Sequence, residues 1–202
     1  MAKLYFRYGA MNSGKSTALL QTAFNYEERG QAVALLKPRI DTKGAESISS
    51  RLGMDRKVDI LLEEGESPRE AFARVVAERG QVACLLVDEA QFLSPWQIDE
   101  LFRIAVLDGS PVLSYGIRTD FQTIAFPGAR RLLEIAHSIE ELKTICRCGR
   151  KAVFNARNID GKFVFAGDQV AIDGDVVTYE SLCGQCYLRE SKGRLASDVT
   201  RR

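Results

Sequence analysis

The sequence predicts an α/β protein that combines a parallel sheet with a small, β-rich subdomain near its carboxyl end. Through about residue 143, apolar runs typical of buried strands alternate with segments of helical periodicity, and this alternation is the pattern of a doubly wound parallel sheet. A glycine-rich string lies between the first strand and the first helix. Beyond residue 143, two pairs of cysteines enclose short alternating segments, which predicts the second, smaller unit.

The amino-terminal elements follow from these patterns. Residues 3–8 (KLYFRY) are expected to form an aromatic and aliphatic strand. Apolar residues recur at helical spacing over 16–29, and Gly30 stands where a helix C-cap is expected. Residues 31–37 (QAVALLK) are expected to form a buried strand. The polar stretch 39–59 is expected to be a long loop, and such loops are often functional.

The middle of the chain carries two helix start signals. Residues 67–70 (SPRE) and 94–97 (SPWQ) each place a serine before a proline, with Glu or Gln three residues after the serine, as in a capping box. The two helices are expected to end near Arg79 and Leu107. The remaining elements of this half are two buried strands and one helix, expected at 82–87 (VACLLV), 111–115 (PVLSY) and 130–139.

Composition limits the class of protein. The chain has 202 residues, 28 Lys and Arg against 27 Asp and Glu, and one histidine, His137. A balanced charge disfavours a protein that works by neutralising nucleic acid, and one histidine excludes a multi-histidine metal site. No apolar run approaches the roughly 18 residues of a membrane span, and the first residues do not resemble a secretory signal. We therefore expect a cytoplasmic protein with reduced thiols and no nucleic-acid or membrane partner.

The glycine-rich string is Gly9-Ala10-Met11-Asn12-Ser13-Gly14-Lys15-Ser16. It fits G-x-x-x-x-G-K-[ST] in the strand–helix setting that this phosphate-binding pattern requires. Glycines let backbone N–H groups converge on phosphate oxygens, and the helix N-terminus adds its positive end. We therefore predict a P-loop NTPase-like sheet in which these eight residues bind ATP, with Lys15 at the β- and γ-phosphates and Ser16 on Mg²⁺. The alternative is a glycine turn with a surface lysine.

Two acidic residues follow the strand 82–87. Ligands bind at the carboxyl ends of strands in open α/β sheets, so Asp88 is the candidate for holding Mg²⁺ beside the phosphate loop. Glu89 points to another face and can take a proton from water or from a substrate hydroxyl. Gln91, in the same box, is assigned to ATP binding. The alternative for Glu89 is a hydrogen bond to a loop.

The cysteines form the second constellation. Cys146 and Cys148 are separated by 34 residues from Cys183 and Cys186, which is typical of a zinc ribbon with four thiolate ligands. A redox dithiol at Cys183 and Cys186 is the rival interpretation. Two expectations argue against it: no helix is expected after this pair, and the other cysteine pair is present. Unliganded thiols are a third possibility. The fifth cysteine, Cys84, is interpreted as a small core residue.

Weaker signals lie near the expected ligand edge of the sheet. Arg118 can steady phosphate charge or pair with Asp120, and the residues alone favour neither. The loop aromatics can stack on a base or close the core beneath the loops; they are Phe92, Phe121 and Phe126. His137 is placed in the helix 130–139 and interpreted as structural or surface-exposed.

In order and spacing, these motifs resemble those of the thymidine kinase family shared by bacteria and the animal cytosol. The resemblance covers nearly the whole chain. It rests on the glycine-rich string 9–16, the box 88–92 (DEAQF), the segment 115–121 (YGIRTDF) and the ordered cysteine pairs. It also includes Gln169-Val170 and Tyr179, which stands four residues before Cys183.

The resemblance implies an enzyme that moves the γ-phosphoryl group of ATP to the 5′-hydroxyl of thymidine, and of deoxyuridine, in pyrimidine deoxynucleoside salvage. It implies Glu89 as general base and a zinc-bound lasso that closes over the base. It also implies a homotetramer that the end product, thymidine triphosphate, inhibits. With Arg118 added from its position, the substrate-binding residues are Phe92, Arg118, Phe121, Val170, Ala171, Ile172, Asp173 and Tyr179.

Domain boundaries complete this interpretation. We expect a P-loop kinase domain over 1–143, a zinc-binding lasso subdomain over 144–192 and a disordered tail over 193–202. The chain differs from the family pattern in Asp173-Gly174, where many members have Gly-Gly, and in the C-x-C spacing of the first cysteine pair. It also has Lys43 where an Asp-x-Arg element is common, and lysine cannot reproduce a bidentate guanidinium contact.

Two other functions compete with a nucleoside kinase. The box 88–91 (DEAQ) resembles the acidic box of helicases, and zinc ribbons often bind nucleic acid, which suggests a nucleic-acid-dependent ATPase. Such motors need a second nucleotide-binding domain, for which this chain has no room. The other alternative is a non-catalytic, ATP-gated switch whose zinc module docks a partner.

Overall fold

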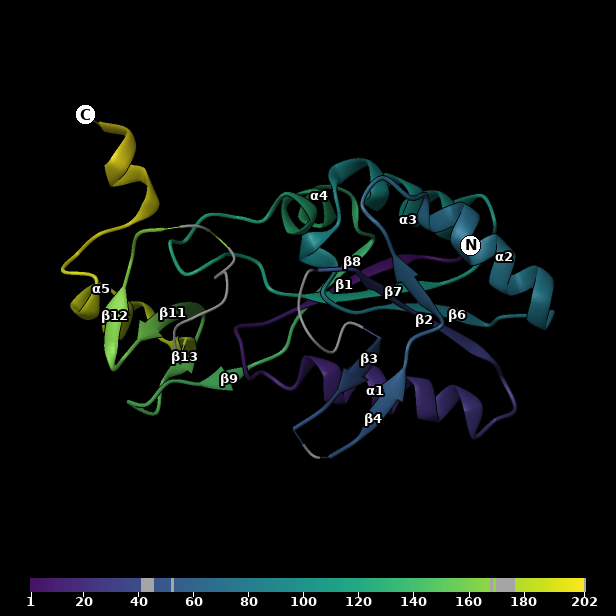
Figure 1. Cartoon of the computed structure of the whole chain (residues 1–202), viewed down its shortest axis with the longest axis horizontal. Helices are drawn as coiled ribbons and strands as arrows, with labels where there is room; N and C mark the ends of the chain where they lie inside the picture. Colours follow the sequence, from purple (N-terminus) through teal and green to yellow (C-terminus); the bar gives the residue numbers. More distant parts are fainter. Residues whose placement is uncertain (41–45, 52, 168, 170–176, 202) are drawn as a thin grey trace.

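A parallel sheet forms the larger part of the molecule. The computed structural model describes residues 1–40, 46–51, 53–167, 169 and 177–201 (Figure 1). The strand order is β5-β2-β6-β7-β1-β8, and each neighbouring pair is parallel, as predicted. In that order the strands are β5 (Ile60–Leu62), β2 (Val33–Pro38), β6 (Cys84–Val87), β7 (Val112–Gly116), β1 (Leu4–Tyr8) and β8 (Ser138–Glu141).

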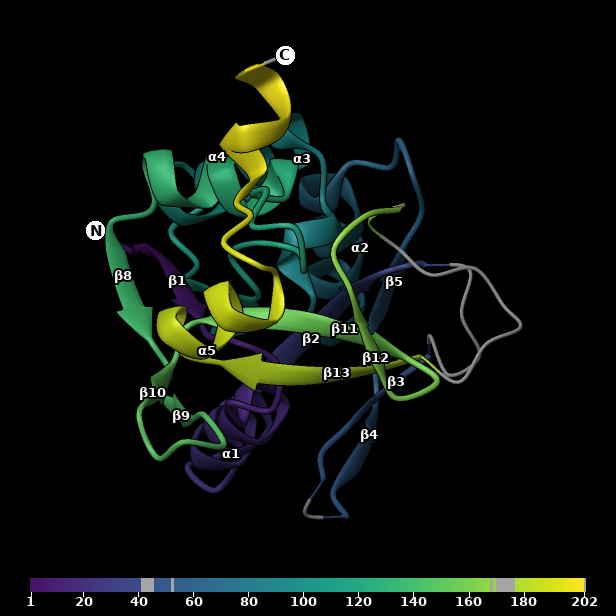
Figure 2. The same cartoon turned by 90° about the vertical axis from the view of Figure 1, so that its left-hand side faces the viewer.

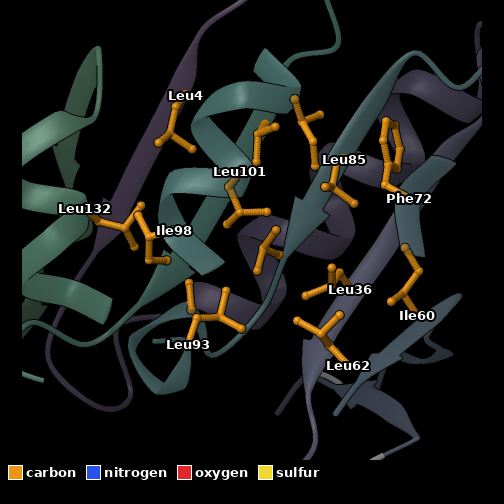
Figure 3. Packing of buried hydrophobic residues seen from close by; sticks show 14 of the residues in the cluster. Leu4, Leu36, Ile60, Leu62, Phe72, Leu85, Leu93, Ile98, Leu101 and Leu132 are labelled. Carbon is orange, nitrogen blue, oxygen red and sulfur yellow. The ribbon is translucent and has the colours of Figure 1, made fainter. Parts of the chain in front are cut away.

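Helices cover both faces of this sheet (Figure 1). One face packs against α2 (Pro68–Arg79), α3 (Pro95–Val106) and α4 (Pro127–Ile135), and the other against α1 (Lys15–Glu27). Figure 3 shows the first of these cores, in which Leu36 and Leu85 of the sheet lie near Leu101 of α3. Neighbouring residues along a strand point to opposite cores, so β6 is apolar throughout and β2 is apolar from Val33 to Leu36.

Capping residues set the helix starts that the sequence predicts. Ser94 and Gln97 form a full capping box at α3, and the side chain of Ser67 accepts from the Glu70 N–H at α2. Prolines occupy the first helical position of both, where a missing N–H costs nothing. Gly80 ends α2 with a φ of 81°, a conformation that glycine adopts without strain.

Two sequence expectations need correction. The stretch 39–59 is not only loop, because β3 (Ser47–Ser49) and β4 (Asp55–Lys57) pair as an antiparallel ribbon that packs near α1. The helix expected over 130–139 is α4, which starts earlier, at Pro127, and ends at Ile135; β8 then follows. β8 is an edge strand with mostly exposed side chains, so it lacks the apolar run that identifies a buried strand.

The second unit is small and β-rich, as predicted (Figure 2). A three-stranded antiparallel sheet has the order β12 (Lys162–Val164), β11 (Phe154–Ile159) and β13 (Val177–Leu182). The short strands β9 (Thr144–Ile145) and β10 (Lys151–Ala152) precede it and α5 (Gly184–Glu190) follows. The end of the chain, expected to be disordered, carries the 3-10 helix η2 (Ala196–Arg201). No helix in the described residues combines the length and apolarity that crossing a bilayer requires.

Candidate active site

The phosphate loop joins β1 to α1, in the setting that the sequence predicts. Asn12 and Gly14 take left-handed backbone conformations, with φ of 64° and 78°. A side chain at Gly9 would lie 2.5 Å from the Leu142 carbonyl oxygen and against Ser13, so only glycine fits there. The Gly9 N–H donates to the Gly116 carbonyl at the end of β7 (3.3 Å). The loop is therefore held against the carboxyl edge of the sheet.

Lys15 lies inside this loop. Its ammonium group donates to the carbonyl oxygens of Ala10 (3.0 Å) and Gly9 (3.4 Å). Burial lowers the pKa of Lys15, while the charges of Glu89 and Asp88 act to raise it. The amine and both carboxylates therefore lie close enough for their charges to interact, as a phosphate-transfer site requires. Ser16 is the next residue, in the first turn of α1.

The two acids follow β6, and their environments differ. Asp88 is buried, and burial raises the pKa of its carboxyl to about 7, with the charge of Glu89 adding to the effect. Glu89 has a left-handed backbone, with φ 50° and ψ 36°. This conformation is rare outside glycine and is typical of functional positions. The chain reverses at Glu89 and continues into the 3-10 helix η1 (Ala90–Phe92).

Gln91 holds the side chain of Glu89. Its amide nitrogen donates to the Glu89 carboxylate, and its amide oxygen accepts from the Ile117 N–H (3.1 Å). A side chain at Gly116 would lie 2.5 Å from that amide oxygen. Gln91 itself is buried. The structure therefore places Gln91, assigned from the sequence to ATP binding, beside the predicted base, with its amide committed to these two contacts.

A pocket of about 220 Å³ adjoins the phosphate loop. It lies between the large sheet and the β-rich subdomain, and both contribute to it. Its lining residues are Met11, Phe92, Ile117, Asp120, Phe121, Phe126, Asn155, Gln169, Val177 and Tyr179. Three of the predicted substrate-binding residues, Phe92, Phe121 and Tyr179, are thus brought together. Phe92 and Phe126 pack edge to face with their ring centres 5.3 Å apart.

Other predicted substrate-binding residues lie elsewhere. Arg118 is absent from the pocket lining, and its guanidinium lies 5.7 Å from the centre of the Tyr8 ring. Among the described residues it forms no ion pair with Asp120, whose carboxylate accepts from two backbone N–H groups and from Gln169. Val170, Ala171, Ile172 and Asp173 lie outside the described residues, as does Lys43.

Sequence reasoning missed Arg157, which contacts three of the lining residues, Phe121, Gln169 and Tyr179. It is buried, and its guanidinium carbon lies 3.8 Å from the centre of the Phe121 ring. Its Nε donates to the Tyr179 hydroxyl (3.0 Å), and its Nη2 donates to the Gln169 carbonyl (2.9 Å). A cation stacked on an aromatic face stabilises both groups. The only sequence signal was its place in a short alternating strand.

The four predicted metal ligands come together. The Sγ atoms of Cys146, Cys148, Cys183 and Cys186 all lie within 4.8 Å of one another. Cys148 lies 3.6 Å from Cys146 and 3.5 Å from Cys183, sulfur to sulfur. Four thiolates on a tetrahedral zinc at about 2.3 Å have sulfur–sulfur distances of about 3.8 Å. The cluster therefore fits a structural zinc ion.

One argument used against a redox dithiol is wrong, because a helix does follow the second cysteine pair. α5 begins at Gly184, and Cys183 caps it by accepting from the Cys186 N–H (3.5 Å). The pKa of the Cys183 thiol is lowered to about 6, and this hydrogen bond is the largest cause. The position of the other cysteine pair remains a sufficient argument, since all four sulfurs converge on one point.

The family model described as Thymidine kinase matches residues 2–187, which is most of the chain. The chain belongs to the thymidine kinase family. Three curated relatives named thymidine kinase support this. They come from Chromobacterium violaceum (47% identity, covering 93% of this chain and 98% of the relative), Ruegeria pomeroyi (45%, covering 96% of both) and Mesorhizobium japonicum (46%, covering 98% and 96%).

In this thymidine kinase family member, Cys84 and His137 make packing contacts and backbone hydrogen bonds away from the site. Cys84 is fully buried in β6, and burial raises the pKa of its thiol to about 12. His137 lies between α4 and β8 rather than in a helix. Its Nδ1 accepts from the Leu4 N–H (3.1 Å), and its ring stacks on Phe102. These contacts agree with the interpretation of Cys84 as core and of His137 as structural.

Asp88→Asn should stabilise the protein at pH 8 when no Mg²⁺ is added. The folded-state pKa of Asp88, about 7, lies above its ordinary value of 3.8. As the pH rises from about 4 to 7, the unfolded chain loses the proton first, so this group progressively destabilises the fold. The full cost is at most about 4 kcal/mol. The variant should therefore unfold at higher urea concentration at pH 8 and gain nothing at pH 4.

Asp108→Asn is the matched control, because Arg69 holds the pKa of Asp108 below its ordinary value. Removing that carboxylate should lower stability at pH 8, the opposite sign. Urea unfolding of both variants at the two pH values measures the contrast. If the two substitutions changed the free energy of unfolding equally at pH 8, burial of the Asp88 carboxylate would not destabilise the fold.

Proposed function

We propose that this protein is an ATP-dependent thymidine kinase that transfers the γ-phosphoryl group of ATP to the 5′-hydroxyl of thymidine, and of deoxyuridine. The observation that carries the proposal is the charge interaction of Lys15 with Asp88 and Glu89, with an aromatic-lined pocket that adjoins the same phosphate loop at Met11. Family membership and relatives named thymidine kinase support the same substrate. The product would be thymidine monophosphate, as in pyrimidine deoxynucleoside salvage.

The phosphate loop is assigned to ATP. The N–H groups of residues 14–16, at the positive end of α1, would face the β- and γ-phosphates, and Lys15 would exchange its loop carbonyl partners for phosphate oxygens. Ser16 and Asp88 are the residues that would hold Mg²⁺; when bound, the ion neutralises charge on the phosphate oxygens. Asp88 is poised for this role, because a cation offsets the cost of burying its carboxylate.

Glu89 is assigned as the general base. The 5′-oxygen of the nucleoside forms a bond to the γ-phosphorus, and the bond from that phosphorus to the bridging oxygen breaks, which releases ADP. The hydroxyl proton passes to the Glu89 carboxylate. Gln91 keeps this carboxylate oriented before the substrate arrives. Most of the acceleration then comes from positioning and from charge stabilisation rather than from covalent chemistry.

The pocket beside the loop is assigned to the nucleoside. Phe92, Phe121 and Tyr179 supply aromatic surface for a flat base, and Arg157 fixes Phe121 and Tyr179 in place. The lasso segment that includes Val170, Ala171, Ile172 and Asp173 would close over the base and exclude water, which would otherwise receive the phosphoryl group. A zinc ion on the four cysteines would hold both ends of this subdomain together.

Four further assignments belong to the same proposal. The kinase domain spans 1–143, the lasso subdomain 144–192, and the tail 193–202 lies outside both. The active form is a homotetramer in the cytoplasm. Thymidine triphosphate inhibits it by occupying the nucleoside pocket and the phosphate loop together. Neither nucleic acid nor a membrane is a partner, in keeping with the net charge of +1.

The deciding experiment is a phosphoryl-transfer assay with ATP, Mg²⁺ and each common deoxynucleoside. We expect labelled monophosphate from thymidine and deoxyuridine and none from the purine deoxynucleosides. A thermal-shift panel separates the competing functions, because ligands stabilise the proteins that bind them. Stabilisation by oligonucleotides but not by deoxynucleosides would instead indicate a nucleic-acid-dependent ATPase, and stabilisation by ATP alone a switch protein.

A further inference from the structure

The tip of the phosphate loop is held by side chains of the β-rich subdomain. The Met11 N–H donates to Asn155 Oδ1 (2.7 Å), and the Met11 carbonyl accepts from the Ser181 hydroxyl. The next carbonyl, that of Asn12, accepts from the Thr144 hydroxyl (3.3 Å). Three polar groups of the loop backbone, in two adjacent residues, thus have their partners more than 130 residues away in the sequence.

Two of these partners, Asn155 and Ser181, belong to one face of one sheet. Asn155 in β11 and Ser181 in β13 are directly paired across the strands, and Arg157 and Tyr179 form the pair two residues along. Side chains two residues apart on a strand share a face. The first pair therefore holds the phosphate loop, while in the second pair Tyr179 lines the nucleoside pocket and Arg157 donates to its hydroxyl. Asn155 also lines that pocket.

The contacts are buried and specific. Asn155 is 3% exposed and Ser181 is 7% exposed. The side-chain amide nitrogen of Asn155 donates to the Thr119 carbonyl (3.2 Å), and this second hydrogen bond fixes the orientation of the side chain. Because these two side chains are buried and Met11 is half-buried, removing one partner leaves a loop carbonyl or N–H with little access to water in place of its hydrogen bond. The loop conformation thus depends on these side chains, in addition to the sequence of the loop itself.

We propose that Asn155 and Ser181 are positioning residues that hold the phosphate loop in its ATP-binding shape and link it to the nucleoside pocket. The proposal rests on the assignment of that pocket and loop in the proposed function. A nucleoside that fixes Arg157 and Tyr179 also fixes the neighbouring pair on the same sheet face. Thymidine should then tighten ATP binding, and ATP should tighten thymidine binding by the same factor.

Ser181→Ala tests the link directly. We expect the dissociation constant for Mg·ADP to rise about five- to tenfold, the usual scale for one lost hydrogen bond. The dissociation constant for thymidine, measured without nucleotide, should change less than twofold. The tightening of ADP binding by thymidine should shrink. Ser181→Thr, which keeps the hydroxyl, should restore ADP affinity. Calorimetric titration gives these constants, and zinc content confirms the subdomain is intact.

Ser191→Ala is the matched control, because Ser191 lies in the same subdomain, is buried and also donates its hydroxyl to a backbone carbonyl, that of Arg194 in the tail (2.9 Å). It should leave ADP affinity unchanged. If Ser181→Ala does not fold, Thr144→Val removes a hydroxyl contact from the loop at a less buried position and should weaken ADP binding two- to fivefold.

Equal ADP affinity in Ser181→Ala and Ser191→Ala, with zinc retained in both, would overturn the proposal; Thr144→Val with wild-type affinity would do the same where Ser181→Ala does not fold. Neither result would affect the proposed function, since thymidine phosphorylation by the wild type is measured separately. Conversely, a wild-type protein that phosphorylates no nucleoside would refute the kinase assignment. The ADP titrations would still decide whether the subdomain holds the loop.

Discussion

Glu89→Gln should lower turnover at least about 100-fold, the usual scale for a lost general base, while the binding of ATP and thymidine stays nearly unchanged. Glutamine has the same shape, and its amide oxygen can still accept a hydrogen bond from the side chain of Gln91. It cannot accept a proton from the 5′-hydroxyl. Steady-state kinetics should therefore show a fall in kcat with little change in KM for either substrate. Calorimetric titrations with thymidine and with ADP test whether the binding site of the variant is intact.

Glu28→Gln is a suitable control, since Glu28 is exposed at the end of α1 and touches no part of the site. Its turnover should match that of the wild type. If Glu89→Gln also turned over at the wild-type rate, another group would have to receive the proton. The carboxylate beside Lys15 would then serve only to orient neighbouring groups.

Cys183→Ser should abolish zinc binding and most of the stability of the β-rich subdomain. The wild type should carry about one zinc per chain, because its four sulfurs already lie at the separations of a tetrahedral site. A structural zinc contributes on the order of 10 kcal/mol to the fold that holds it. Tyr179, four residues before Cys183 in the strand β13 that leads to it, should lose its place in the pocket. Metal analysis and thymidine titration measure both losses.

Cys84→Ala separates this effect from the loss of any buried thiol. Cys84 lies in the core of the large sheet, away from the cluster, so the variant should keep its zinc and unfold at a slightly lower temperature. If wild-type protein contained no zinc after gentle purification, the four-thiolate site would be refuted. Retention of zinc by Cys183→Ser would show that three cysteines suffice.

Local signals made the large sheet predictable. The apolar runs of β2, β6 and β7 are long because both faces of each strand are buried, and serine–proline pairs mark the starts of α2 and α3. β8 and the β3–β4 ribbon were missed for the opposite reason. Their side chains are largely exposed, and their pairing depends on neighbours far away in the sequence.

The chemical groups of the site were more predictable than the groups that support them. Residues that bind phosphate, accept a proton or ligate a metal must be of particular types at particular spacings. Lys15, Glu89 and the four clustered cysteines can therefore be recognised in the sequence. Asn155 and Arg157 act through tertiary contacts, and no short pattern marks them. Gln91 was recognised as part of the box, but its contacts with Glu89 and Ile117 depend on how η1 turns beneath β7.

The hydrogen bond between Ser181 and Met11 spans 170 residues of sequence, which has a consequence for biosynthesis. A chain emerging from the ribosome exposes its phosphate loop early, yet the strand that completes the surroundings of that loop is translated near the end. Contacts of such long range also slow folding, because a large loop must close before they form. A growing polypeptide would therefore reach its full nucleotide affinity only after the strand that carries Ser181 has been synthesised.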